Sequence, residues 1–227
     1  MGALQELQVI HIATHDSIGT GEDGPTHQPV ELAALYRAMP NLLYIRPCDS
    51  EETAGAFQAA LKAKHNSTII STSRQVLPQW PHSKRDSVAF GAYTFREVEN
   101  AHITIIGVGS EMCFAIDASD KLATFGINAR VVSFPCQRLF EQQSWEYQRS
   151  VLRRAEIPSI VIEAYSANGW ERYADASISM RTFGKSLPGK DAYREFGFDG
   201  KVIAGKIQGY LEDLKSGKTF RGEFREL

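Results

Sequence analysis

The chain has 227 residues, 43% of them hydrophobic and 23% charged, a balance that excludes a disordered or fibrous protein. Its formal net charge of −2 provides no positive field for a polyanion, which argues against nucleic acid as a partner. No apolar run reaches the roughly 18 residues of a membrane span, and the N-terminus lacks the basic region of a signal peptide. The three cysteines lack metal spacing, which predicts reduced thiols. We therefore expect a cytoplasmic protein.

The first part of the chain alternates between strand-like and helix-like segments. Apolar runs rich in β-branched residues predict buried strands at 7–14, 41–47 and 67–73. Amphipathic stretches between them predict helices at 29–39 and 51–63. This alternation is typical of a parallel sheet with right-handed crossovers.

The second part repeats the pattern after a polar, irregular stretch from 79 to about 100, which predicts a linker. The expected strands are 101–109, 129–134, 159–164 and 176–180, and the expected helices are 110–126, 144–155, a short one near 169–175, and those from Asp191 and Asp199 onward. The fold class is therefore α/β with mainly parallel sheets. We expect a first unit over 1–95 with too few strands for a complete domain, and a self-sufficient second unit over 96–227.

The densest group of titratable side chains lies between the first strand and the first helix. Residues 14–31, THDSIGTGEDGPTHQPVE, contain two histidines and four acids among glycines. Glycines let the backbone approach a ligand closely, and imidazoles titrate near neutral pH and suit proton transfer. We therefore predict that this loop carries the chemistry of the protein.

Two other interpretations of this loop fail on physical grounds. The segment 19–24, GTGEDG, has the spacing of a dinucleotide-binding turn, but Glu22 and Asp23 would place two negative charges where a pyrophosphate binds. His11 and His15 share a strand face without a third ligand nearby, so no metal site is assigned to the chain.

Several segments match one known family in the order in which that family carries them. They are THDSIG (14–19), GEDGPTHQP (21–29), RP (46–47), SRQ (73–75), GSE (109–111), RVVS (130–133), TFG (182–184) and FGF (196–198). In these segments the chain resembles transketolases over essentially its whole length. The segments WERYAD (170–175) and SLPGK (186–190) are more similar to the dihydroxyacetone synthase branch of that family.

The resemblance implies both a fold and a reaction. It implies part of a thiamine-diphosphate-binding (pyrimidine) domain followed by a transketolase C-terminal domain. Transketolases move a two-carbon ketol unit from a ketose phosphate to an aldehyde, with thiamine diphosphate and a divalent metal, Mg²⁺ or Ca²⁺. By the same resemblance, His27 would polarise a donor oxygen and pass a proton, and Asp23 would accept a hydrogen bond from a substrate hydroxyl. His15 and Arg74 would bind the distal phosphate.

Other parts of the family pattern are missing from the sequence. The Gly-Asp-Gly motif and downstream Asn that bind metal and diphosphate are not found, nor is the glutamate that activates the aminopyrimidine, so no cofactor-binding residue is assigned. We expect a larger partner chain to anchor the cofactor, and this chain to be the small subunit of a split enzyme that is inactive alone. A non-catalytic regulatory module and a fragment of a longer chain are the alternatives, and the acceptor (formaldehyde or a sugar phosphate) stays open.

Four charged residues outside the loop have no single interpretation. Arg46 and Asp49 fit a site and a scaffold equally well, and Glu111 is expected to be a first-turn helix acid. Glu163 ends a predicted strand, either as a buried, paired charge or as part of a subunit contact. Trp170 is expected in the core.

Overall fold

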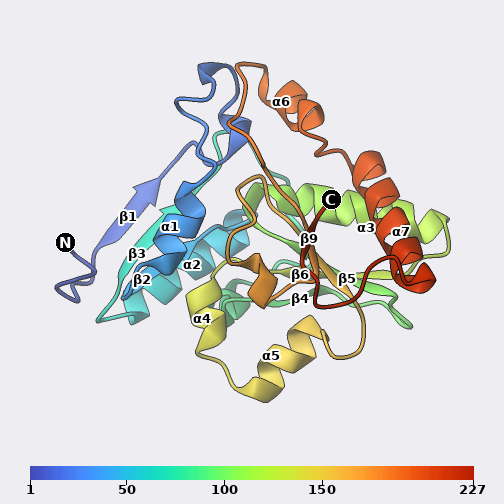
Figure 1. The fold of residues 1–227 in the computed structure, drawn as a ribbon. Coiled ribbons are helices and arrows are strands. Elements are labelled where there is room, and N and C mark those ends of the chain that lie inside the picture. Colours follow the sequence, from blue (N-terminus) through green and yellow to red (C-terminus); the bar gives the residue numbers. More distant parts are fainter.

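The computed structural model describes all 227 residues, which form two α/β units with one sheet each (Figure 1). We call residues 1–71 the N-terminal unit and residues 93–227 the C-terminal unit. The elements of the N-terminal unit are β1 (Ile10–Ala13), η1 (Ile18–Asp23), α1 (Leu32–Ala38), β2 (Leu42–Ile45), α2 (Ser50–Lys62) and β3 (Ser67–Ser71).

The C-terminal unit follows a connection that contains η2 (Arg85–Phe90). Its strands are β4 (Tyr93–Arg96), β5 (Ile103–Gly107), β6 (Ala129–Ser133), β7 (Ser159–Ile162), β8 (Ala176–Ile178) and β9 (Arg225–Glu226). Its helices are η3 (Gly109–Glu111), α3 (Met112–Thr124), α4 (Gln137–Glu141), α5 (Trp145–Leu152), η4 (Trp170–Arg172), α6 (Gly189–Glu195) and α7 (Gly200–Ser216). None of the helices is long and apolar enough to cross a membrane.

The N-terminal sheet has the order β1-β3-β2, and both of its strand pairs are parallel. All four residues of β2 are buried, as its run of Leu, Leu, Tyr and Ile predicts. The helix α2 begins where the side chain of Asp49 accepts a hydrogen bond from the Glu52 amide, and it crosses back toward β3. Helical crossovers of this kind are what parallel strands require.

The C-terminal sheet has the order β4-β6-β5-β7-β8-β9, in which only the β4–β6 pair is antiparallel. Helices α3 and α7 pack together on one side of this sheet, and α5 lies on the other (Figure 1). The main hydrophobic core lies between the sheet and α3 with α7. A second cluster on the opposite side includes Trp170, which is buried as predicted. The α/β fold with mainly parallel sheets is confirmed.

The predicted linker at 79–100 is wrong in part, because it contains η2 and β4. Tyr93 and Phe95 of β4 point into the core while the residues between and after them are half-exposed. A strand this short, surrounded by polar residues, has too little alternation to stand out in the sequence.

The unit boundary expected between 95 and 96 stays a prediction. Because β4 spans it and pairs with β6, we propose that the connection 72–92 divides the units.

A buried ionic cluster joins the two units. The Arg46 side chain, with no exposed surface, follows β2 and donates from Nε to Asp16 Oδ2 (2.8 Å), from Nη2 to Glu111 Oε2 (2.9 Å) and from Nη1 to Glu163 Oε1 (2.6 Å). Arg37 of α1 forms a two-pronged pair with both oxygens of Glu163 (2.8 and 2.6 Å). Two of the three carboxylates come from the C-terminal unit, so the cluster fixes the two sheets relative to each other.

The cluster settles three of the roles that the sequence leaves open. Arg46 belongs to the scaffold, and Glu163 is a buried, paired charge. Burial alone would raise the pKa of the Glu163 carboxyl, but Arg37 and Arg46 outweigh burial and hold this pKa at about 2. Glu111 lies just before α3, but it is fully buried, and it pairs with Arg46 and accepts a hydrogen bond from Tyr193 (2.9 Å).

A second buried carboxylate also crosses between the units. Glu52 of α2 has no exposed surface and accepts hydrogen bonds from the Cys48 amide (2.8 Å), the Tyr93 hydroxyl (2.8 Å) and the Ser133 hydroxyl. Desolvation raises the pKa of this carboxyl, and the three donors oppose that rise. In both of these buried clusters the carboxylates are paired or hydrogen-bonded, so separating the units would leave buried groups unpaired.

We expect Arg46→Met to lower the free energy of unfolding by about 3–5 kcal/mol, because it leaves three buried carboxylates without their shared cation. Urea unfolding followed by circular dichroism measures this loss. Arg85→Met, which breaks an exposed pair with Glu51, is the matched control and should stay close to wild type. A loss for Arg46→Met no larger than that of the control would contradict the scaffold role.

Candidate functional site

The residues predicted to carry the chemistry lie at the carboxyl edge of the N-terminal sheet. All three strands run in the same direction, so their carboxyl ends share one edge. His15 follows β1 and Arg74 follows β3, and Arg46 of the buried ionic cluster follows β2. This edge of an open parallel sheet is where α/β proteins place their ligands.

His15 and His27 line one cleft of about 390 Å³ at this edge. Both imidazoles are exposed, and the cleft wall between them includes Tyr44 from β2. Tyr165 and Phe183 of the C-terminal unit also line it, so the cleft lies between the two units. The structure therefore places the two loop histidines in one cleft, and their roles toward a ligand stay predictions.

The two histidines have the same local environment. Thr14 Oγ1 lies 2.9 Å from Nδ1 of His15, and Thr26 Oγ1 lies 2.9 Å from Nδ1 of His27. Each hydroxyl engages one ring nitrogen, and Nε2 of each ring has no partner within the chain. A ring held in this way can donate or accept a proton at Nε2, depending on its tautomer.

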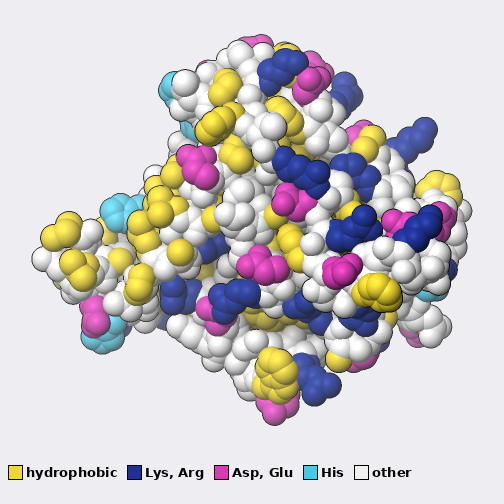
Figure 2. Space-filling view, viewed as in Figure 1, with side chains coloured by type: hydrophobic (Ala, Val, Ile, Leu, Met, Phe, Trp, Pro, Cys, Tyr) yellow, Lys and Arg dark blue, Asp and Glu magenta, His cyan; other side chains and the backbone are white.

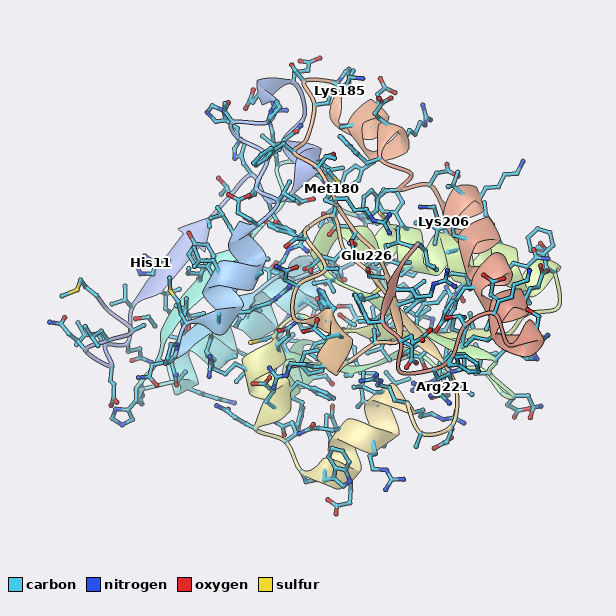
Figure 3. The ribbon with its side chains drawn as sticks, viewed as in Figure 1. His11, Met180, Lys185, Lys206, Arg221 and Glu226 are labelled. Atoms are coloured by element: carbon cyan, nitrogen blue, oxygen red, sulfur yellow. The ribbon has the colours of Figure 1, made fainter.

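The loop between the histidines is folded against the C-terminal unit. Gln28 is buried, and its Nε2 donates to the carbonyls of Gly21 (2.8 Å) and Lys185 (3.0 Å). Figure 3 shows Lys185 at the tip where these segments meet. Gly21 has a φ of +85°, and a Cβ there would lie 3.2 Å from the Gly189 backbone nitrogen. The glycine is therefore required both by its backbone conformation and by the close approach.

Asp23 and Arg74 do not line this cleft. Asp23 is exposed at the end of η1. Arg74 is also exposed, and its Nη1 donates to the Thr20 carbonyl (3.1 Å) on the same loop, while Nε and Nη2 have no partner in the chain. The substrate-binding roles of these two residues stay predictions.

Sequence reasoning missed the aromatic residues of the cleft. Tyr165 comes directly after the predicted strand that ends at Ala164, and its hydroxyl donates to Asp16 Oδ1 (2.6 Å). Its ring also lies over the Arg46 guanidinium, 4.5 Å from the ring centroid. The rule that site residues follow the carboxyl ends of strands could have identified Tyr165, but its partner is 149 residues away in the sequence.

The donor groups of the cleft fit a sugar better than the metal-bound diphosphate of thiamine diphosphate. Two imidazoles and several hydroxyls suit a polyol. Asp16, the buried acid of the cleft, already uses its carboxylate on Arg46 and Tyr165. The chain has no group of three or more His, Cys, Asp or Glu side chains arranged to bind a metal ion. His11 lies on β1, at the outer edge of the sheet (Figure 3).

Comparison with known proteins accounts for both units. The sequence profile of the transketolase pyrimidine-binding domain matches residues 1–79, and that of the transketolase-like C-terminal domain matches residues 91–199. A dihydroxyacetone synthase of Candida boidinii is 50% identical over 228 residues, which cover 100% of this chain and 32% of that protein.

Two solved structures share the fold. A transketolase of Pichia stipitis in complex with sedoheptulose 7-phosphate has a TM-score of 0.92 and 38% identity, covering 95% of this chain and 32% of its own. A split-gene transketolase, described as an inactive β4 tetramer, has a TM-score of 0.72 and 20% identity, covering 90% of this chain and 67% of its own, and this likeness concerns the fold alone.

The chain spans about a third of the length of the curated relatives that it matches. Its two matched regions follow each other in the order pyrimidine-binding domain, then C-terminal domain. The chain therefore belongs to the transketolase family.

Proposed function

We propose that this chain supplies the sugar-binding and proton-transfer residues for two-carbon ketol transfer, in an active site completed by a larger partner chain. The observation that supports this most directly is the shared cleft of His15 and His27, with Nε2 of both rings unpartnered. The relatives add the substrate class, because they include a dihydroxyacetone synthase and a transketolase with a bound ketose phosphate.

In the proposed reaction, four residues of this chain act on the substrate. His27 polarises the donor's carbonyl oxygen and moves a proton at Nε2. Asp23 accepts a hydrogen bond from a substrate hydroxyl. His15 and Arg74 bind the distal phosphate, the guanidinium through the N–H groups that the Thr20 carbonyl leaves free. Thiamine diphosphate, when bound, supplies the electron sink that carbon–carbon cleavage requires.

A partner chain is supported by the free surface of the N-terminal unit. The strand β1 is an edge of its sheet, with Ile12 51% exposed. Leu4 and Leu35 of the same unit are 79% and 50% exposed. Figure 2 shows hydrophobic side chains gathered over the N-terminal tail and beside α1. An unpaired strand beside apolar side chains is a surface that another α/β unit would cover, and we assign it to the partner that anchors the cofactor.

We expect ketol transfer to appear when the missing part of a relative is added. The Candida boidinii synthase, shortened to the part that this chain does not match, would be mixed with this chain and thiamine diphosphate. Transfer from a ketose phosphate to formaldehyde or to an aldose would then be measured. The shortened relative mixed with its own remaining third is the positive control. If a complex forms, binds no thiamine diphosphate and is inactive while the control is active, the chain is a regulatory module instead.

Within an active complex, His27→Ala should lower kcat by roughly 10²–10⁴-fold, the range of a general acid–base group. Steady-state kinetics at saturating donor measure this change. His65→Ala, which removes another exposed histidine distant from the cleft, should leave kcat unchanged. An unaltered kcat in His27→Ala would assign this histidine to the scaffold.

Arg74→Ala should raise KM for phosphorylated donors by about tenfold or more, because a charge-assisted hydrogen bond is lost. The KM for an unphosphorylated donor should stay the same, and the comparison of the two donors is the measurement. Arg74→Lys keeps the charge but loses the fork, so its KM should fall between those of wild type and Arg74→Ala. Equal effects on both donors would reject the phosphate role.

A further inference from the structure

The backbone around His15 is in an unusual conformation. His15 has a φ of +66° and Ser17 a φ of +64°, a region that residues with a side chain seldom adopt. Such a conformation persists only where the surrounding structure holds it. Thr20 Oγ1 donates to the carbonyls of both residues (2.8 and 3.0 Å), and the Ser17 hydroxyl donates to Glu111 Oε1 (3.2 Å). The residue between them, Asp16, connects this loop to both units.

Asp16 is anchored at three points. Its side chain, 3% exposed, accepts hydrogen bonds from Arg46 Nε (2.8 Å) and from the Tyr165 hydroxyl (2.6 Å). Its backbone amide donates to the Thr72 carbonyl (3.1 Å), which follows β3. By contrast, the His15 ring has one hydrogen-bond partner, the neighbouring Thr14 hydroxyl. The direction of the His15 ring is therefore determined by its backbone, and Asp16 is the adjacent residue that fixes this backbone to Arg46, Tyr165 and Thr72.

Tyr165 is the anchor that belongs to the C-terminal unit. It follows β7, it is 1% exposed, and its ring lines the cleft that contains His15. Desolvation and the nearby Asp16 carboxylate raise the pKa of its hydroxyl well above the usual range, so this hydroxyl stays a proton donor. Arg46 bonds to two further carboxylates, whereas Tyr165 donates to Asp16 alone.

We propose that Tyr165 is a positioning residue that, through Asp16, holds the His15 imidazole toward the cleft. The effect on substrate rests on the phosphate-binding role of His15 in the proposed function. In this arrangement the C-terminal unit contributes to the site by fixing a strained loop of the N-terminal unit. Tyr165 itself takes no part in the chemical step.

Tyr165→Phe tests the proposal, because it removes one hydroxyl and keeps the ring over Arg46. The His15 ring signal in the NMR spectrum, identified by its loss in His15→Asn, should shift or broaden as the loop samples other conformations. The Asp16 amide should exchange with solvent about tenfold faster, while core amides such as that of Ile105 keep their rates. Tyr210→Phe is the matched control, because the buried Tyr210 hydroxyl has no hydrogen-bond partner, and it should change neither signal.

Two results would overturn the proposal. Unchanged His15 and Asp16 signals would show that the hydroxyl does not hold the loop, and a uniform rise in exchange across all amides would make Tyr165 a purely structural residue. If Tyr165→Phe does not fold, Asp16→Asn, which weakens the same hydrogen bonds, should give the same selective change. These readouts need no activity, so they decide the positioning role even if the complex shows no ketol transfer. In an active complex, Tyr165→Phe should raise KM for phosphorylated donors about five- to tenfold with kcat unchanged.

Discussion

One buried guanidinium determines how the two halves of this chain fit together. The nitrogens of Arg46 bind carboxylates from the loop that contains His15, from the segment before α3 and from the end of β7. A charge removed from water is tolerated only when it is paired and hydrogen-bonded, so none of these groups can move away without leaving another unsatisfied. The polar network therefore holds the two sheets in one arrangement, beside apolar clusters that the units also share, such as those that contain Ile45 with Cys136 and Tyr44 with Tyr165.

This constraint also shapes the candidate site. Asp16, which belongs to the network, lies next to His15 in the loop, and Tyr165 donates to Asp16 from the other unit. The cleft therefore has histidines from one unit and aromatic residues, Tyr165 and Phe183, from the other. A loop rich in glycine would by itself sample many conformations. Here the fold restricts it, which is what a site that must orient a ligand requires.

The sequence predicts the features that depend on neighbouring residues. The apolar run of β2, the α/β alternation, and the histidines in a glycine-rich loop are all local patterns, and the fold class and the shared cleft agree with them. Burial of a charge depends on distant partners, so Glu111, 65 residues from Arg46, looked like an ordinary helix acid. The role of Tyr165 is missed for the same reason, whereas β4 is missed because a strand of four residues has too little alternation to stand out. Asp23 and Arg74 lie outside the cleft of the two histidines. The sequence could not predict this separation, because family motifs carry no information on distances.

Native-state hydrogen exchange across both sheets tests the central claim most directly. If the Arg46 network holds the units together, slowly exchanging amides of β2 and β3 and those of β5 and β7 will open with the same free energy and the same dependence on denaturant. In Arg46→Met, the opening free energies of the two sets of amides will differ. Independent opening of the N-terminal sheet in the wild-type chain, well below the free energy of the C-terminal sheet, would contradict this account.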